Sequence, residues 1–190
     1  GLMVSSLASY AAYQRESAWT WEHQALTRAR WVAGSATIGA AFEAVRREVL
    51  MRPRDARTLS AEIVEMRNKM RASLDRSTTE LWDLKQGAGG LIDIEFITQY
   101  LVLRDAHREP AIVVWSDNWR QLEALAAAGS LAADDRDTLI ASYRVLRGWA
   151  HAQSLQQQVT MLEAERFATE RAAIVALWQR VFPSLQEAAD

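Results

Sequence analysis

Apolar residues recur at steps of three and four along almost the whole sequence, which is the spacing of one face of an α-helix. Apart from the first few residues, no segment alternates between apolar and polar positions as a half-buried strand does. We therefore predict an all-α fold, a bundle of about eight helices. The helices are expected over residues 6–17, 19–33 and 91–106, over 133–157, and around the apolar positions of 38–49, 59–74, 119–125 and 174–181.

Glycines and capping residues mark where several of these helices should begin and end. Gly34 should end the second helix, because glycine readily adopts the left-handed conformation that follows a helix. Ser116 or Asp117 should cap the helix that Gly129 closes. The helix over 91–106 is apolar almost all round, so we expect it to be the most buried.

The composition narrows the class of protein and the compartment. A formal net charge of -2 gives no argument for binding to nucleic acid or to an anionic membrane. No cysteine is present, which excludes disulfides and thiolate zinc sites and fits a reducing compartment. No apolar run approaches the roughly 20 residues that a membrane span requires. We expect a cytoplasmic protein with no nucleic-acid and no membrane partner.

The beginning of the sequence and its aromatic content suggest a part of a larger protein. Gly1-Leu2-Met3-Val4 is typical of the end of a strand and has no initiator methionine. We interpret residues 1–190 as a single helical domain that starts partway through a protein. The eight tryptophans suggest large flat packing surfaces, one of which could meet another domain.

The sequence lacks the motifs that would let this chain catalyse a reaction by itself. His23, His107 and His151 lie far apart, and none has a second ligand at metal-binding spacing. No serine lies in a nucleophile-elbow pattern, and no glycine-rich phosphate loop ends in Lys-Ser or Lys-Thr. The sequence therefore predicts no catalytic residue and no metal site of its own.

Two acidic pairs could be mistaken for metal-binding carboxylates. Asp135 and Asp137 lie in the first turn of an expected helix, where the helix dipole favours acidic residues. Asp93 and Glu95 are followed by a helical pattern, and side chains two residues apart diverge by about 200° on a helix. We expect them to cap the helix, to pair with an arginine or to face a neighbouring site, but not to chelate Mg²⁺ together.

The irregular stretch before this helix is the strongest candidate for ligand binding. Lys85 and the glycines that follow it, Gly87, Gly89 and Gly90, lead directly into a helix N-terminus. Free N–H groups and a positive partial charge would suit an anion such as phosphate there, and Lys85 would add a mobile positive charge. The alternative is a tight turn whose glycines only permit unusual backbone angles.

Basic residues on the earlier helices have a plain structural interpretation. Arg28 and Arg30 point to nearly opposite sides of the second helix, which also carries Glu22, so an amphipathic helix with a salt-bridged rim is the simple alternative to ligand binding. A longer basic stretch is interleaved with acidic residues, and we interpret it as a solvated helical face. Its arginines are Arg46, Arg47, Arg52, Arg54, Arg57, Arg67 and Arg71.

Several segments in this order resemble the bacterial glutamine synthetase adenylyltransferase family, also called glutamate–ammonia-ligase adenylyltransferase/adenylyl-removing enzymes. The resemblance covers nearly the whole chain. The segments are AWTWEHQALTRARWVAG, REVLMRPRD, MRNKM, LWDLKQGAGGLIDIEFITQYLVLR and WSDNWRQLEAL.

The resemblance implies an enzyme with two similar halves, each a nucleotidyltransferase domain followed by a helical domain. One half removes AMP from a tyrosine of glutamine synthetase, and the other adds it with ATP and Mg²⁺, while PII signal proteins and glutamine set the direction. This chain is similar to the helical domain of the C-terminal, adenylylating half. The family's Gly-Ser and Asp-x-Asp signature is missing, so the metal-binding aspartates should lie upstream, and we expect no activity and no bound cofactor in this chain alone.

The resemblance also implies roles for individual residues. Arg28, Lys85, Gly89 and Gly90 would lie near the ATP phosphates or the departing pyrophosphate. The supporting acidic residues would be Glu22, Asp93 and Glu95, which would hold the cationic groups in place. The expected seam with the upstream domain is aromatic and consists of Tyr13, Trp19 and Trp21.

Two other functions stay open. The bundle could instead be a regulatory module that binds PII proteins or relays their signal. It could also be the matching domain of a related uridylyltransferase, although the run DIEFITQYLVLR argues against this assignment.

Overall fold

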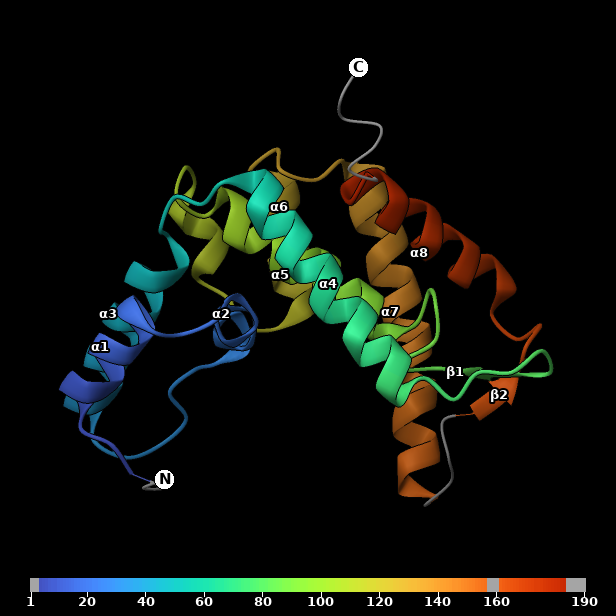
Figure 1. Cartoon of the computed structure of the whole chain (residues 1–190), viewed down its shortest axis with the longest axis horizontal. Coiled ribbons are helices and arrows are strands. Elements are labelled where there is room, and N and C mark those ends of the chain that lie inside the picture. Colours follow the sequence, from blue (N-terminus) through green and yellow to red (C-terminus); the bar gives the residue numbers. More distant parts are fainter. Residues whose placement is uncertain (1–3, 157–160, 184–190) are drawn as a thin grey trace. The chain divides into compact units, whose positions relative to one another are not determined.

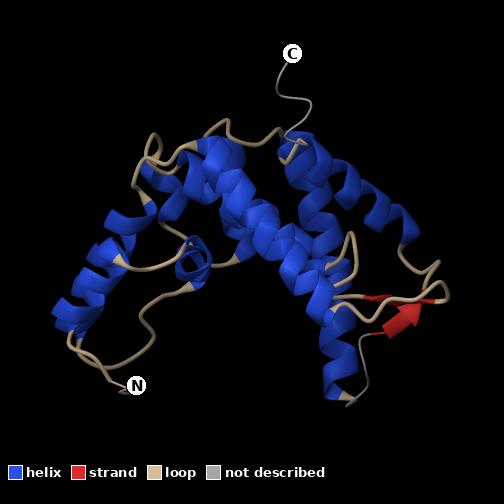
Figure 2. Cartoon of the chain, in the orientation of Figure 1, coloured by secondary structure: helices blue, strands red, loops and turns tan. Residues whose placement is uncertain are grey.

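The computed structural model describes residues 4–156 and 161–183, and helices account for most of them (Figures 1 and 2). The all-α prediction is confirmed, with eight α-helices among the described residues. The α-helices are α1 (Leu7–Glu16), α2 (Thr20–Arg28), α3 (Ala36–Leu50), α4 (Ala56–Leu74), α5 (Leu91–Asp105), α6 (Asn118–Ala127), α7 (Ala133–Leu155) and α8 (Ala168–Val181). A short 3₁₀-helix, η1 (Pro110–Val113), precedes α6.

Two short strands form an antiparallel pair that the periodicity did not predict. They are β1 (Leu81–Asp83) and β2 (Met161–Glu163), and Trp82 lies opposite Leu162 (Figure 2). Three residues are too few to display a period of two, so only the tertiary pairing of distant segments defines these strands. The strand suggested at the start of the sequence falls mostly on residues 1–3, which lie outside the described residues.

The chain divides into two compact units. The first unit contains Gly1–Glu62 and Gln99–Ser130, and the second contains Ile63–Thr98 and Leu131–Asp190. In the first unit α1 and α2 pack on α3, and η1 packs against α6. In the second unit β1 pairs with β2, and α7 packs along α8. The single domain over residues 1–190 stays a prediction.

The second helix ends earlier than its apolar pattern predicted. Helix α2 stops at Arg28 instead of reaching residue 33. The buried guanidinium of Arg46 donates hydrogen bonds to the carbonyl oxygens of Leu26 and Thr27, at 3.1 and 3.0 Å, and Gln121 donates to that of Thr27 at 2.9 Å. These side chains take the place of the N–H groups that another turn of helix would supply.

The interpretation of the arginine stretch as a solvated face is wrong for Arg46. Its side chain is 2% exposed, and it also donates to the carbonyl of Val113 at 2.8 Å. Burial lowers the pKa of Arg46, and the nearby carboxylate of Glu43 opposes this effect. A buried guanidinium of this kind is held by several acceptors at once, which spacing along one helix cannot reveal.

Helix α5 is the buried helix that the sequence predicted. All of its residues except Ile92, Glu95 and Arg104 are buried. Asp93 and Glu95 lie on this helix and not on a strand. Among the other expected helix starts, Asp117 caps α6 by accepting a hydrogen bond from the N–H of Arg120 at 3.0 Å.

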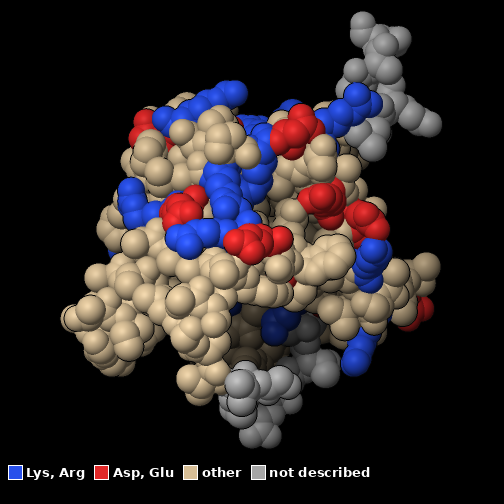
Figure 3. Space-filling model, turned by 60° about the vertical axis from the view of Figure 1, so that its left-hand side comes forward, with Lys and Arg blue, Asp and Glu red and all other residues tan. Residues whose placement is uncertain are grey.

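The outer faces carry mixed charge. Figure 3 shows lysine and arginine side chains lying next to aspartate and glutamate side chains on the face that it presents. Asp135, in the first turn of α7, forms an ion pair with Arg180 of α8 at 2.6 Å. None of the helices in the described residues combines the length and the apolar composition that a bilayer span requires.

Candidate functional site

The turn before α5 is built around Asp83, at the end of β1. Its Oδ1 accepts hydrogen bonds from the backbone N–H groups of Lys85 and Gln86, at 2.9 and 3.0 Å. Its carbonyl oxygen accepts from the N–H of Gly87 at 2.8 Å. An aspartate that bonds to the backbone two and three residues on is a common way to start a tight turn. The turn leaves Lys85 exposed while Asp83 is buried.

Gly89 and Gly90 are required by the geometry of this turn. Gly89 has a φ of +74°, and a Cβ there would lie 2.6 Å from the carbonyl oxygen of Arg171 in α8. A Cβ on Gly90 would lie 2.8 Å from the carbonyl oxygens of Leu84 and Gly87. The two glycines therefore allow both a left-handed backbone and a close approach of neighbouring chain.

The N–H groups at the start of α5 are already hydrogen-bonded. Gly89 donates to the carboxylate of Asp93 at 2.8 Å. The next three N–H groups donate to carbonyl oxygens of residues 84–87 at 2.9 to 3.2 Å. The expectation of free N–H groups for an anion is therefore wrong, because the turn uses them itself. The placement of Gly89 and Gly90 near a nucleotide stays a prediction.

Asp93 is the centre of a buried cluster of charges. Its Oδ1 accepts a hydrogen bond from Nε of Arg67 at 2.7 Å, and both carboxylate oxygens accept from Nη2 of Arg71 at 3.0 and 3.1 Å. Asp93 is 2% exposed and Arg67 is fully buried. The expected pairing of Asp93 with an arginine is therefore found, and its partners both come from α4.

Arg67 ties this cluster to the glycine turn. It donates from Nη2 to the carbonyl oxygen of Gln86 at 2.7 Å and from Nη1 to Oε1 of the same residue at 3.2 Å. Burial lowers the pKa of Arg67, and the charge and hydrogen bond of Asp93 oppose this effect. The prediction of a solvated face is wrong here too. Arg67 and Arg71 lie one helical turn apart, and that spacing was the available signal for a shared partner.

Lys85 and Glu95 line the same pocket in the second unit. The pocket has a volume of about 340 Å³, and α7 contributes Arg147, His151 and Ser154 to its wall. The hydroxyl of Tyr143 donates to Oε1 of Glu95 at 3.4 Å and accepts from Nη1 of Arg147 at 3.0 Å. We call this site the Lys85 pocket. Arg147 and Ser154 were not predicted as site residues, and His151 was considered only as a metal ligand, because all three lie more than 50 positions beyond Glu95 and carry no motif.

The other predicted site residues belong to the first unit, on or beside α2. Glu22 is half-buried, and its carboxylate accepts from the N–H of Trp19 at 2.8 Å and from the hydroxyl of Tyr13 at 2.7 Å. It therefore caps the start of α2. Arg28 is half-buried at the last position of that helix. Whether either residue approaches a nucleotide stays a prediction.

The three aromatic residues proposed for an interdomain seam are exposed. Trp19 is 70% exposed, and Tyr13 and Trp21 are exposed by nearly half. Exposed aromatic side chains of this size often mark a contact surface. Their part in a seam stays a prediction.

The carboxylate of Asp93 does not suit a divalent cation. Both oxygens of Asp93 accept hydrogen bonds from arginine, and one of them also accepts from Gly89. Across residues 4–156 and 161–183, no three side chains of the metal-binding types converge. Mg²⁺ would need oxygen ligands that this cluster does not offer.

Comparisons with known proteins identify two matching family models. A model described as glutamate-ammonia ligase adenylyltransferase matches residues 1–45. A model described as GlnD PII-uridylyltransferase matches residues 57–162. The second match contains the run DIEFITQYLVLR, which we expected to argue against a uridylyltransferase domain. The match shows that this run by itself is no such argument.

Three curated relatives match almost the whole chain, and each is named bifunctional glutamine synthetase adenylyltransferase/adenylyl-removing enzyme. The protein of Hahella chejuensis is 46% identical over 96% of the chain, and that of Nitrosococcus oceani is 50% identical over 94%. The protein of Pseudomonas aeruginosa is 45% identical over 95%. The chain spans 18 to 20% of the length of these relatives.

Proposed function

We propose, because this chain belongs to the family of bifunctional glutamine synthetase adenylyltransferase/adenylyl-removing enzymes, that it serves adenylyl transfer as a helical domain. In the intact enzyme it would follow the adenylylating nucleotidyltransferase domain and form one wall of its cleft. AMP would pass there from ATP to a tyrosine of glutamine synthetase. The enzyme would act in the cytoplasm, without nucleic acid or membrane as a partner.

The Lys85 pocket is the observation that carries this proposal. Phosphoryl transfer depends on positioning and on positive charge near the transferring phosphates. Lys85 has an exposed ammonium group with no ion-pair partner within the described residues, and Arg147 lines the same pocket. Two cations and one carboxylate, that of Glu95, give these side chains a net positive charge, which suits a polyphosphate or pyrophosphate.

The buried cluster would hold Lys85 in place. The carbonyl oxygen of Lys85 accepts from the N–H of Ile92 at 3.2 Å, and its own N–H donates to Asp83. The Asp93 cluster holds the rest of the turn through Gly89 and Gln86. Such anchoring restricts the backbone of Lys85 while its side chain stays free to reach a ligand.

ATP would supply the adenylyl group, and Mg²⁺ would neutralise its phosphates. Since the Asp93 cluster offers no ligand set for the cation, the metal-binding carboxylates would come from the adjoining domain in cis. The role of this chain would be to orient the phosphates and stabilise charge on the departing pyrophosphate. We expect neither ATP binding nor AMP transfer by the 190-residue chain alone.

The test uses the only two lysines of the chain. Lys85→Ala in the intact enzyme should lower the rate of glutamine synthetase adenylylation by about tenfold or more, because an electrostatic group near the phosphates is lost. Lys69→Ala removes an exposed lysine that pairs with Glu65 on α4, and it should leave the rate unchanged. Equal rates in the two variants would contradict the proposed position of Lys85.

A second function is favoured by the match to the GlnD PII-uridylyltransferase model over residues 57–162. The chain would then act mainly as a module that binds a PII signal protein or relays its signal. Footprinting of the intact enzyme separates the two functions. Protection of Lys85 by ATP supports the wall of the transfer cleft, whereas protection of residues 115–129 by PII supports the regulatory module.

A further inference from the structure

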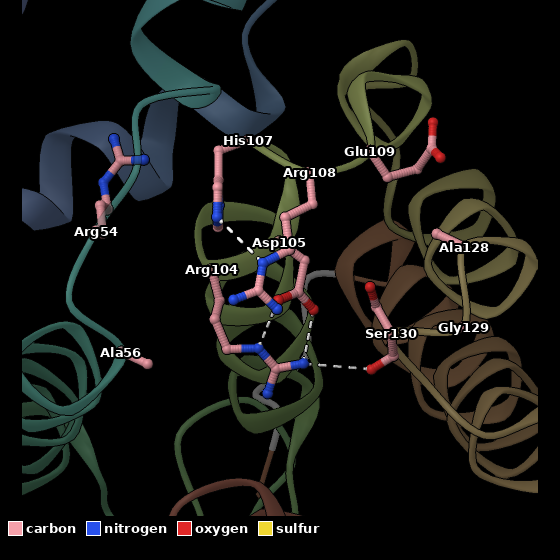
Figure 4. A pocket seen from close by; sticks show the side chains of 10 residues that line it. All are labelled: Arg54, Ala56, Arg104, Asp105, His107, Arg108, Glu109, Ala128, Gly129 and Ser130. Carbon is pink, nitrogen blue, oxygen red and sulfur yellow. Dashed lines mark hydrogen bonds and ion pairs between the residues drawn. The ribbon is translucent and has the colours of Figure 1, made fainter.

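A second pocket lies in the first unit, where α5 and α6 end (Figure 4). Its volume is about 430 Å³, within the range of small-molecule sites. We call it the α5–α6 pocket. The charged and titratable side chains in its wall are Arg54, Arg104, Asp105, His107, Arg108 and Glu109.

The two carboxylates of the α5–α6 pocket are occupied by neighbouring groups. Arg104 donates to both oxygens of Asp105, at 2.8 and 2.6 Å. Burial alone would raise the pKa of Asp105, but the hydrogen bonds and charge of Arg104 lower it. Glu109 caps η1 by accepting from the N–H of Ala111 at 3.3 Å, and its carboxylate points away from Arg104 in Figure 4. Asp105 is therefore neutralised by Arg104, and Glu109 is the one carboxylate of the pocket without a cationic partner within the described residues.

Two guanidinium groups of the pocket have no carboxylate partner within the described residues. Arg54 donates to carbonyl oxygens at the end of α3, including that of Val49 at 2.9 Å. Burial and the nearby charge of Arg52 lower the pKa of Arg54 to about 10, so it stays charged at neutral pH. Arg108 is exposed and uses only Nε, which donates to Nε2 of His107 at 3.2 Å. The positive charge of this pocket is therefore not fully compensated.

His107 supports Arg108 and has one ring nitrogen that is enclosed. Its Nε2 accepts from Arg108 and must be unprotonated, so the neutral imidazole carries its proton on Nδ1. This Nδ1 is buried and has no hydrogen-bond partner within the described residues. Because this atom is enclosed, a ligand in the pocket cannot reach it, and the exposed guanidinium of Arg108 is the donor that the pocket presents.

Carbonyl oxygens at the ends of α5 and α6 would oppose an anion if they were free. Several are already hydrogen-bonded. Arg54 donates to the carbonyl of Leu103 and Arg104 to that of Ser130, both at 3.4 Å. The N–H groups of Gly129 and Ser130 donate to the last turn of α6. The Nη groups of Arg108, which make no hydrogen bond within the described residues, are the donors left for a ligand.

We propose that the α5–α6 pocket binds a small metabolite through a carboxylate or phosphate group, with the guanidinium of Arg108 as its donor. This site is separate from the Lys85 pocket and does not depend on the function proposed for that pocket. Arg54 contributes positive charge without contacting the ligand.

The test is a titration of the ¹⁵N-labelled chain at constant ionic strength, followed by NMR. Inorganic phosphate and succinate are the two probes, and the one that binds more tightly identifies the class of ligand. Saturable shifts should be confined to residues 104–109 and 128–130. Arg108→Ala should weaken binding by about tenfold or more, since a charge-assisted hydrogen bond is lost.

Arg57→Ala is the matched control, because Arg57 is exposed on α4 in the same unit and does not line the pocket. It should bind the probes like the parent chain. Equal affinity in the Arg108→Ala and Arg57→Ala variants would overturn the proposal. So would the absence of saturable binding of either probe up to about 10 mM.

Discussion

Individual charged residues determine more of this fold than their sequence positions suggest. Arg46 and Arg67 lie in a stretch that alternates basic and acidic residues, yet both are buried. Arg46 binds carbonyl oxygens and, at 3.4 Å, the carboxylate of Glu43. Arg67 binds the carboxylate of Asp93 and the glycine turn. Because moving a charge from water into the protein interior is costly, each guanidinium needs several hydrogen-bond acceptors.

Loss of the charge on Asp93 should destabilise the chain strongly. Asp93→Asn leaves Arg67 buried and Arg71 partly buried without a carboxylate, so the free energy of unfolding should fall by about 3–5 kcal/mol. Urea denaturation measures this change. Asp135→Asn breaks the more exposed pair with Arg180 and should cost no more than about 1 kcal/mol. Equal losses in the two variants would show that the Asp93 cluster does not stabilise the fold.

Two glycine substitutions should change stability in opposite directions. Gly89→Ala forces a Cβ into a left-handed backbone beside Arg171, and should cost at least about 1–2 kcal/mol. Gly148→Ala lies inside α7 with no atom within 4 Å of the new Cβ, and should stabilise by about 0.5–1 kcal/mol. Thermal unfolding compares them, and a loss of stability in both variants would refute the distinction.

At the scale of the elements, side chains from α3 and α6 determine where α2 ends. The apolar pattern continues toward residue 33, but Arg46 and Gln121 hold the last carbonyl oxygens of α2 in a helix end. The strands β1 and β2 likewise exist only because residues 81–83 and 161–163 meet. Local periodicity cannot report either contact.

Replacement of Arg46 should loosen the end of α2. Arg46→Met leaves buried carbonyl oxygens of Leu26, Thr27 and Val113 short of donors, and should lower the free energy of unfolding by about 3 kcal/mol. Arg47→Met, at the neighbouring half-buried position, should change it by no more than about 0.5 kcal/mol. Hydrogen exchange should rise in α2 only in the first variant, and unchanged exchange there would contradict the capping role.

In the molecule as a whole, the chain passes between the two compact units at three points, two of them within helices. The first boundary falls inside α4, between Glu62 and Ile63, and the second inside α5, between Thr98 and Gln99. The third boundary falls between Ser130 and Leu131, outside the α-helices. The single domain over residues 1–190 stays a prediction.

Thermal unfolding should therefore follow one cooperative transition. Differential scanning calorimetry should show a single endotherm, because neither α4 nor α5 can unfold in one unit alone without exposing its own backbone bonds. Asp93→Asn in the second unit and Arg46→Met in the first should both move that endotherm to lower temperature. Two separate endotherms, each moved by only one substitution, would contradict the prediction.

The sequence alone was enough to predict the helical class, the burial of α5 and the helical placement of Asp93 and Glu95, because periodicity and capping act within a few residues. It also identified the glycine turn as unusual. The folded structure was needed to show that the N–H groups of this turn are used internally, that Arg67 and Arg71 share Asp93, and that α7 completes the Lys85 pocket. These features depend on which distant segments pack together. Local spacing along the sequence therefore cannot predict which groups become buried or which hydrogen-bond partners they find.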